Sequence, residues 1–400
     1  MNSRRNFIGT FAGGIAGTLA ARPGVLGAND RIRIGLIGAG DRGMQLAQEL
    51  KRCEGAEIGA VADVFEERRE RLKSAAPQAR TYQDYRRLLE QRDIDAVLIA
   101  TPQHLHAEQF IASALAGKHI YVEKALALTA DDVKRMQAAR DKQAGLVAQV
   151  GHQFCSSGLM DDAARFLAAG LVGRVTAIRA HMYRNTPHGK PQWRRPVLAG
   201  MTADKIAWDL FLGDAPRRDF DAHRFVNWRY FRDYSGGNVH EGMSQQIAFW
   251  YRALGLGIPE AVTMRGGTYL WDDGREVPDT MHVAMEHGGG LLFTWDSGFG
   301  NNHLGTGEYV LGTDGTIHRG QQLRYWPEKV NRPGGRETQG RTTTEPQAHL
   351  RNFLDSMRGQ AEPACPFELG ARVAITCAMA VASHRLGRTV YWDPAREEIV

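Results

Sequence analysis

Short apolar runs alternate with amphipathic stretches over the first third of the chain. The runs at 32–37, 56–62, 96–100, 119–122 and 146–150 predict buried strands, and the stretches at 42–53, 104–116 and 129–143 predict helices. Strands that alternate with helices indicate a parallel sheet with helices on both faces. Ligands of such sheets bind beyond the carboxyl ends of the strands. The pattern therefore predicts a doubly wound α/β domain over residues 29–150.

The pattern changes after about residue 151. Alternating apolar and polar positions predict strands at 174–183, 261–269, 281–286, 291–295, 308–312 and 316–318. Helices are predicted at 160–169, 241–254, 349–358 and 367–386, and the polar segment 328–346 is predicted to be a long loop. Strands clustered in this way indicate an α+β domain with an open, mostly antiparallel sheet over residues 151–400. We expect its last helix to pack back on the first domain.

Composition adds few constraints. The 400 residues are 43% hydrophobic and 24% charged, which is typical of a globular protein with two domains. The net charge of +5 includes Arg4, Arg5 and Arg22 near the N-terminus. No basic stripe with interleaved aromatic residues is present, so nucleic acid is not an expected partner. The four cysteines have no C-x-x-C spacing and are predicted to be buried thiols.

The first residues match an export signal. Residues 3–8, Ser-Arg-Arg-Asn-Phe-Ile, follow the twin-arginine pattern, and residues 7–21 are apolar but rich in glycine and alanine. That stretch is too short and too weakly hydrophobic to span a bilayer well. We therefore expect residues 1–28 to be a twin-arginine signal peptide. The mature protein would be periplasmic or otherwise exported, with no stable membrane span after processing.

A glycine-rich turn follows the first predicted strand. Residues 38–43, Gly-Ala-Gly-Asp-Arg-Gly, form the G-x-G-x-x-G fingerprint of a dinucleotide-binding Rossmann unit and open the first predicted helix. The amino end of that helix offers free N–H groups to a pyrophosphate. Asp63 lies 20 residues after Gly43, where a carboxylate binds ribose hydroxyls and repels a 2′-phosphate. The sequence thus favours NAD over NADP.

Two later segments end at the same edge of the predicted sheet. They are residues 100–106, Ala-Thr-Pro-Gln-His-Leu-His, and 121–125, Tyr-Val-Glu-Lys-Ala. The segments resemble the T-P-x-x-x-H and E-K-P motifs of the Gfo/Idh/MocA oxidoreductases. The resemblance extends over nearly the whole mature chain and includes 207–213, the Gly236-Gly237 pair and 349–354. It implies NAD or NADP chemistry on sugars, cyclitols or related polyols, and a homo-oligomer formed through the open sheet.

The resemblance also assigns roles by position. Thr101, Pro102 and His104 would line the nicotinamide side, and Gln153 would touch the nicotinamide amide. Glu123 would hold a cofactor ribose or orient its neighbour. The full set of expected cofactor residues is Gly38, Ala39, Gly40, Asp41, Arg42, Asp63, Thr101, Pro102, His104, His106, Glu123, Lys124 and Gln153.

Lys124 is also a catalytic candidate on chemical grounds. When a hydride leaves a carbinol carbon, the hydroxyl proton must depart and a cation must stabilise the oxygen. A lysine in a half-buried cleft can do both if its pKa is lowered. The next residue, Ala125, departs from the proline of the family motif.

A second departure follows the Gly236-Gly237 pair. Many family members carry an acid or amide there, with a histidine four residues later that shares proton transfer with the lysine. This chain has Glu241 and then Gln245, and glutamine cannot exchange a proton near neutral pH. Either Lys124 works alone, or His240 or Glu241 takes the acid–base role.

The substrate residues are expected in segments that face the cleft. Aromatic and polar side chains suited to sugars gather at Tyr183, Asn185, Trp193, Trp208, Arg229, Arg232 and Tyr234. The candidate substrate contacts are Lys124, Tyr183, Trp208, Arg232, Asn238 and Glu241, and Tyr183 is also a candidate catalytic residue. The histidine spacings match no metal-ligand motif, so no metal is expected.

Three functions remain open. The first is a sugar or glycoside oxidoreductase whose bound NAD is recycled in place. The second is an NAD-dependent glycosidase working through a 3-keto intermediate, because the 236–246 segment resembles the exported glycosidases of the same superfamily. The third is an inactive sugar-binding protein with a structural NAD.

Overall fold

The computed structural model describes residues 31–343 and 345–400. The predicted signal peptide, residues 1–28, lies outside the described residues. None of the described helices is both long and apolar enough to cross a membrane.

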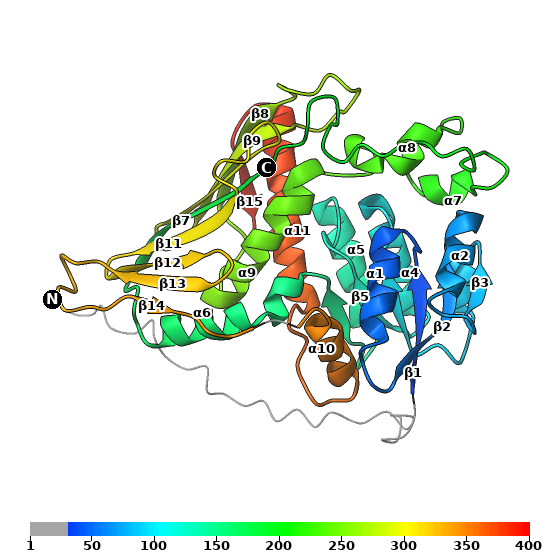
Figure 1. The fold of residues 1–400 in the computed structure, drawn as a ribbon, viewed down its shortest axis with the longest axis horizontal. Helices are drawn as coiled ribbons and strands as arrows, with labels where there is room; N and C mark the ends of the chain where they lie inside the picture. Colours follow the sequence, from blue (N-terminus) through cyan, green and yellow to red (C-terminus); the bar gives the residue numbers. More distant parts are fainter. Residues whose placement is uncertain (1–30, 344) are drawn as a thin grey trace.

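The first domain is built on a parallel six-stranded sheet (Figure 1), with strand order β3-β2-β1-β4-β5-β6. This is the order of a dinucleotide-binding Rossmann sheet. The strands are β1 (Ile32–Ile37), β2 (Ala56–Ala62), β3 (Arg80–Tyr82), β4 (Ala96–Ile99), β5 (His119–Val122) and β6 (Ala148–Val150). The helices are α1 (Asp41–Leu50), α2 (Glu66–Lys73), α3 (Tyr85–Leu89), α4 (His106–Leu115) and α5 (Ala130–Asp141), with a 3₁₀ turn η1 (Gln103–Leu105).

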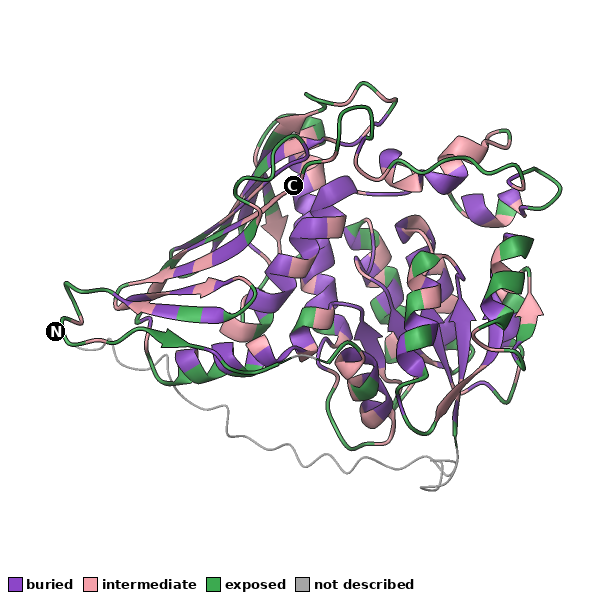
Figure 2. Cartoon of the chain, viewed as in Figure 1, coloured by how far each residue is buried: buried purple, intermediate pink, exposed green. Residues whose placement is uncertain are grey.

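Burial explains why these runs form strands. The central strands β1 and β4 are apolar and almost completely buried (Figure 2), because helices cover both faces of the sheet. The two clusters of buried side chains lie on opposite faces: Ile37, Val97 and Ile99 belong to one, and Leu36 and Leu98 to the other. The predicted doubly wound domain is confirmed.

The second domain is built on a ten-stranded sheet with order β14-β13-β12-β11-β7-β10-β9-β8-β15-β16. Its strands are β7 (Val175–Tyr183), β8 (Ala261–Gly267), β9 (Thr280–His287), β10 (Leu291–Gly298), β11 (Thr306–Gly312), β12 (Gly315–Arg319), β13 (Leu323–Pro327), β14 (Thr338–Gln339), β15 (Val390–Asp393) and β16 (Glu398–Ile399). Only the β7–β10 pair is parallel, so the prediction of a mostly antiparallel sheet is confirmed.

The helices of the second domain are α6 (Gly158–Ala168), α7 (Trp208–Leu212), α8 (Ala222–Val226), α9 (Ser244–Leu254), α10 (Ala348–Met357) and α11 (Phe367–Leu386), with short turns η2 (Gln153–Ser156), η3 (Trp228–Tyr230) and the π-helical η4 (Val239–Met243). Of these, α9 and α11 lie between the ten-stranded sheet and the first domain (Figure 1). The C-terminal helix α11 packs against β6: a Cβ on Gly370 would lie 2.4 Å from Val150, and the Val150 N–H donates to the Cys365 carbonyl at 2.9 Å.

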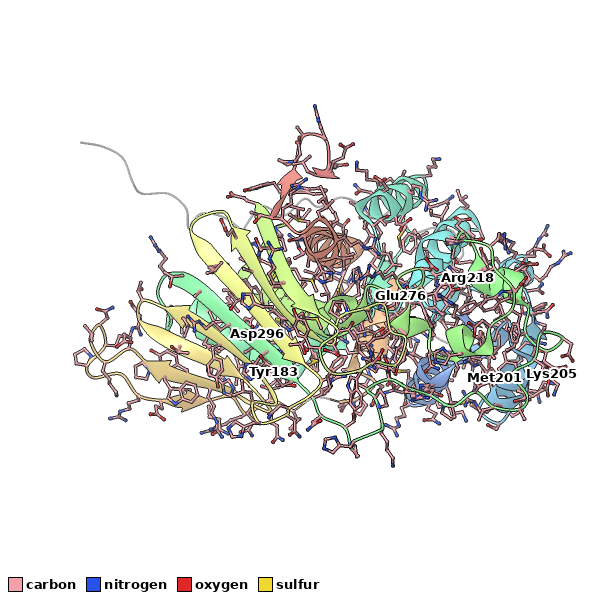
Figure 3. The ribbon with its side chains drawn as sticks, turned by 90° about the horizontal axis from the view of Figure 1, so that it is seen from above. Tyr183, Met201, Lys205, Arg218, Glu276 and Asp296 are labelled. Atoms are coloured by element: carbon pink, nitrogen blue, oxygen red, sulfur yellow. The ribbon has the colours of Figure 1, made fainter. Side chains whose placement is uncertain are left out.

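A long crossover segment, residues 184–235, runs from the end of β7 over the first domain and returns to η4. It carries α7 and α8, which lie beside α2 (Figure 1). An apolar cluster holds it there, with Phe65 of the first domain among Ile206, Phe211 and Phe225. The Ala207 N–H also donates to the Val64 carbonyl at 3.0 Å. The crossover segment thus reaches the far end of the first domain, where Figure 3 shows Met201 and Lys205.

Several elements differ from the sequence prediction. The helix predicted at 241–254 starts earlier, as the π-helical η4, before α9 begins at Ser244. The segment 328–346, predicted to be a loop, contains the two-residue strand β14. Strands β3, β13, β15 and β16 and helices α2, α3, α7 and α8 have no counterpart among the predicted elements. These elements are short and depend on their partners, so they lack the periodicity on which the prediction depends.

A buried ion pair ties α9 to the sheet. The Glu308 carboxylate, 1% exposed, accepts hydrogen bonds from Gln246 Nε2 at 2.8 Å, Trp250 Nε1 at 2.6 Å and Arg319 Nε at 2.7 Å. Side chains of α9 and β12 therefore supply the hydrogen-bond donors and the cation that the buried Glu308 carboxylate needs.

We predict that Arg319→Met destabilises the protein by about 3–5 kcal/mol, because it leaves the Glu308 charge buried without its cation. Chemical denaturation followed by circular dichroism measures this. Arg324→Met, on the neighbouring strand β13 but exposed, is the matched control and should change stability by less than about 0.5 kcal/mol. Equal effects of the two substitutions would contradict the importance of the pair.

Candidate functional site

A cavity of about 720 Å³ opens beyond the carboxyl ends of β1, β2, β4 and β5. The glycine loop and the strand ends of the first domain line one side of the cavity. The crossover segment and the η4–α9 region line the other side. The cavity therefore lies where a doubly wound sheet binds its ligand, and both domains contribute to it.

The glycine loop has the geometry of a dinucleotide cradle. Gly38 has a φ of +94°, and a Cβ there would lie 2.7 Å from the Ala100 carbonyl oxygen. A Cβ on Gly43 would lie 2.0 Å from the Gly38 oxygen, so α1 can approach β1 only with glycine at that position. At Gly40 the space is open, with Arg68 the nearest neighbour at 4.0 Å. Because no side chain caps α1, its first N–H groups are available to a phosphate.

Asp63 supports the loop from the end of β2. Its carboxylate accepts from the Ala39 N–H at 2.7 Å and from the Phe65 N–H at 2.9 Å, and it lines the cavity. Each carboxylate oxygen can accept more than one hydrogen bond, so capacity remains for ribose hydroxyls. The glycine loop and this carboxylate fit NAD.

Glu123, at the end of β5, is the centre of a second network. Its Oε1 accepts from Arg42 Nε at 2.6 Å and from Gln153 Nε2 at 3.1 Å. Burial opposes the charge on Arg42, but attraction to Glu123 prevails and raises the pKa of the guanidinium. Gln153 also accepts from Gln245 Nε2 at 3.1 Å. Gln245, for which the family resemblance predicts a histidine, is thus linked through Gln153 to Glu123.

Lys124 and Glu241 meet across the two domains. Lys124 Nζ donates to Glu241 Oε2 at 2.7 Å and to the Glu241 carbonyl at 3.1 Å. The other carboxylate oxygen lies 3.2 Å from Arg229 Nε and accepts from Gln103 Nε2 at 3.0 Å. Burial raises the pKa of Glu241, but Arg229 and Lys124 outweigh it and hold the pKa at about 2. Glu241 is therefore a carboxylate at neutral pH.

His106 joins residues 100–106 to residues 121–125, the two segments that resemble family motifs. Its Nδ1 lies 2.8 Å from the Ala125 carbonyl oxygen and its Nε2 lies 3.0 Å from the Thr101 carbonyl oxygen. The Lys124–Ala125 peptide bond is cis. Thr101 and Pro102 line the cavity as expected, whereas His106 is buried behind them. His106 therefore positions the two segments rather than facing a ligand.

The structure places the other two candidate histidines away from the cavity. His104 Nε2 bonds to the Phe211 carbonyl oxygen at 2.8 Å, and its ring lies 4.8 Å from that of Tyr234. The ring of His240 lies against Gly236, where a Cβ would be 1.9 Å from Nδ1. Burial lowers the pKa of each histidine to about 4, so both are neutral near pH 7.

Four of the candidate substrate residues do not line the cavity either. The Tyr183 ring lies tilted against that of His181 on the same strand, with the ring centroids 6.2 Å apart, and Tyr183 lies near Asp296 (Figure 3). Side chains two apart in a strand share a face, which here is the one turned away from the helices. Three others bond within the second domain: Trp208 Nε1 donates to the Arg218 carbonyl, Arg232 Nε to the Glu276 carbonyl and Asn238 Nδ2 to Ser297 Oγ.

Some residues of the site were not selected from the sequence. Gln103 lies at a variable position of the T-P-x-x-x-H motif, which gave no reason to choose it. Arg229 was one of seven residues expected to face the cleft, and of those seven it is the one that lines the cavity. Arg195 and Met201 come from the crossover segment, whose position over the first domain has no local sequence signal.

The described residues contain no group of three or more histidine, cysteine, aspartate or glutamate side chains placed to hold a metal ion. All four cysteines are buried and unpaired, as predicted.

Comparison with known proteins agrees with this geometry. Residues 32–152 match the profile of GFO_IDH_MocA, the oxidoreductase family with an NAD-binding Rossmann fold. This match covers the first domain. Myo-inositol 2-dehydrogenase of Thermotoga maritima is 30% identical over 195 residues, which are 49% of this chain and 54% of that protein. The match thus spans about half the length of that relative.

Two further matches differ in extent. A glycosyl hydrolase family 109 protein of Shewanella putrefaciens is 37% identical over 112 residues, 26% of this chain and 24% of that protein. The structure of levoglucosan dehydrogenase in complex with NADH and levoglucosan superposes with a TM-score of 0.70 at 19% identity, over 90% of this chain and 99% of that one. The two-domain architecture is therefore shared over nearly the whole length of both chains.

We predict that Glu241 stabilises the fold in a pH-dependent way. Because its pKa in the folded protein is about 2, against an ordinary 4.5, its stabilising effect is present above about pH 4.5 and is lost as the pH falls toward 2. The gap in thermal midpoint between wild type and Glu241→Gln should therefore be widest near neutrality and shrink between pH 4.5 and 2.

Glu54→Gln, at an exposed position, controls for the loss of one negative charge. A gap for Glu241→Gln that stays constant from pH 7 to pH 2 would show that the carboxylate is not held by Lys124 and Arg229.

Proposed function

We propose that the chain is an NAD-dependent oxidoreductase that acts on a hydroxyl group of a sugar or glycoside and restores its bound cofactor within each turnover. The observation that carries this proposal is the placement of Lys124 Nζ in a cavity that also contains the glycine loop and Asp63. A cation suited to an alcohol oxygen thus shares one cavity with the residues that fit NAD. The relatives named for inositol and levoglucosan support a polyol or sugar as substrate.

Lys124 and Glu241 would perform the acid–base chemistry. An ammonium group has three donors, and two of those of Lys124 are directed at Glu241, so one remains for a substrate oxygen. To act as the base in oxidation, Lys124 would first release one proton to solvent; its neutral amine would then accept the hydroxyl proton and return it during reduction, while Glu241 stabilises the charged form. NAD, when bound, supplies the hydride transfer. Gln245 would orient Gln153 rather than move a proton.

Contacts of the crossover segment support a retained cofactor. Arg195 Nη1 lies 2.6 Å from Asp41 Oδ2 of the glycine loop, and Leu198 and Met201 line the cavity. A segment held in this way would have to move before a dinucleotide could leave. Retention would suit the export that the twin-arginine pattern predicts, since little free nicotinamide cofactor is present outside the cytoplasm. We further propose a periplasmic or otherwise exported homo-oligomer, and native mass spectrometry of the mature protein would test cofactor retention and subunit number together.

A glycosidase working through a 3-keto sugar is the second candidate. The similarity to a glycosyl hydrolase family 109 protein favours it. Such a reaction needs a base for the proton at C2, and Glu241 is placed to serve. A carboxylate whose pKa is held at about 2 is a weak base, however, and this favours the oxidoreductase.

We predict that Lys124→Ala lowers the rate of substrate oxidation by about 10²–10⁴-fold, the usual contribution of a positioned acid–base group. Absorbance at 340 nm follows reduction of the bound cofactor in a single turnover with a panel of glycosides and polyols. Lys142→Ala, at an exposed position, should leave the rate unchanged. An unchanged rate for Lys124→Ala would refute the mechanism, and the absence of any reduction by wild type would favour a sugar-binding protein with structural NAD.

The two enzymatic candidates differ in solvent exchange. In deuterium oxide, the oxidoreductase should return sugar without deuterium at C2, because it does not break that C–H bond. A glycosidase of the second type should place deuterium there. Mass spectrometry and proton NMR of sugar recovered after partial turnover measure the exchange.

A further inference from the structure

Arg68, on α2, lines the cavity without a polar partner of its own. Among the described residues, its guanidinium contacts two aromatic rings and forms no ion pair or hydrogen bond. The other two arginines of the helix are bonded. Arg69 Nη1 donates to the Asp63 carbonyl at 2.6 Å, and Arg71 Nη2 donates to the Ala39 carbonyl at 3.2 Å. The donors of Arg68 therefore remain free for a ligand.

The free guanidinium borders the space that Gly40 leaves open. A Cβ at Gly40 would meet no atom nearer than Arg68 Nη1, at 4.0 Å. In the dinucleotide fingerprint, the second glycine lacks a side chain so that a pyrophosphate can approach the backbone. Gly40 is that glycine, and α1 begins at the next residue. A pyrophosphate that uses this space would come within reach of Arg68.

Two aromatic rings support the plane of the Arg68 guanidinium. Its Cζ lies 4.8 Å from the centre of the Phe225 ring and 5.8 Å from that of Phe65. A guanidinium at such distances is attracted to the face of the ring. Phe225 belongs to α8 of the crossover segment, Phe65 belongs to the first domain, and both are buried. Arg68 thus connects the glycine loop to the crossover segment.

We propose that Arg68 binds the pyrophosphate of the dinucleotide and thereby fixes the crossover segment over the bound cofactor. This inference rests on the retained cofactor of the proposed function and names a residue that retains it. A guanidinium supplies paired N–H donors to phosphate oxygens. Because the same guanidinium packs on Phe225, phosphate binding would also restrain α8 and the following η3. That turn carries Trp228 and Arg229, which line the cavity.

Release of the cofactor from the full-length holoprotein tests the contact. Isotope-labelled NAD is added in excess, and its exchange into the protein is followed by native mass spectrometry. Arg68→Met removes the charge but keeps an apolar side chain, and it should speed release by about 10-fold or more. Arg52→Met, at an exposed position outside the cavity, is the matched control and should leave the release rate unchanged.

Fragments of the cofactor identify the group that Arg68 holds. Displacement of bound NADH, followed by its fluorescence, gives the affinities of ADP-ribose, which contains the pyrophosphate, and of adenosine, which lacks it. Arg68→Met should weaken ADP-ribose by about 10-fold or more and adenosine by less than about 2-fold. Retained adenosine affinity also shows that the variant is folded. Equal losses would place the side chain against the adenosine, and a loss confined to NADP would place it at a 2′-phosphate; either result would refute the proposal.

Amide hydrogen exchange tests the link to the crossover segment. In wild type, saturating ADP-ribose should slow exchange over residues 222–230, whereas saturating adenosine should not. In Arg68→Met, ADP-ribose should lose this effect even when it saturates the site. Equal protection in the two proteins would show that the crossover segment is fixed without Arg68.

The outcomes separate this inference from the proposed function. If Arg68→Met releases NAD and binds ADP-ribose as wild type does, the contact is refuted while the oxidoreductase stands. If wild type binds neither NAD nor ADP-ribose, the proposed function itself fails. All three measurements report binding and need no turnover.

Discussion

The ion pair between Lys124 and Glu241 is the contact on which the site depends. The lysine lies two residues after the end of β5, and the glutamate lies on the π-helical turn that precedes α9. The pair therefore joins the two domains at the bottom of the cavity. Side chains of both residues are less than a fifth exposed, so each charge requires the other.

The surrounding residues keep this pair in place and set its protonation. Arg229 and Gln103 bind the carboxylate oxygen that Lys124 leaves free, and together with Lys124 they keep Glu241 ionised. His106 fixes the segment that carries Lys124 from behind. Gln245 contributes no exchangeable proton, but it links Gln153 and hence Glu123 to the same region. These contacts thereby hold Lys124 and Glu241 in place on both sides of the cavity.

Local patterns in the sequence were sufficient for most of the first domain, although β3, α2 and α3 were not predicted. The glycine loop, Asp63 and the two motif segments around Thr101 and Lys124 all lie where strand ends meet, because a parallel sheet brings its carboxyl edges together. Local patterns did not predict the cavity residues that long-range packing brings into place. Arg195 and Met201 reach the cavity only because an apolar cluster lays the crossover segment over the first domain. Tyr183 was expected to face the cleft, but side chains alternate along a strand. Its neighbour Met182 faces the helices, and Tyr183 lies on the other face of the sheet.

The position of α11 has a consequence for the core of the first domain. Strand β6 is the edge of the parallel sheet, and Gly370 of α11 packs directly on Val150 of that strand. The residues that cover this edge come about 220 positions later in the chain. One buried cluster contains Val150, Cys365 and Val373, so the core on this side of the first domain is complete only when that later segment is present.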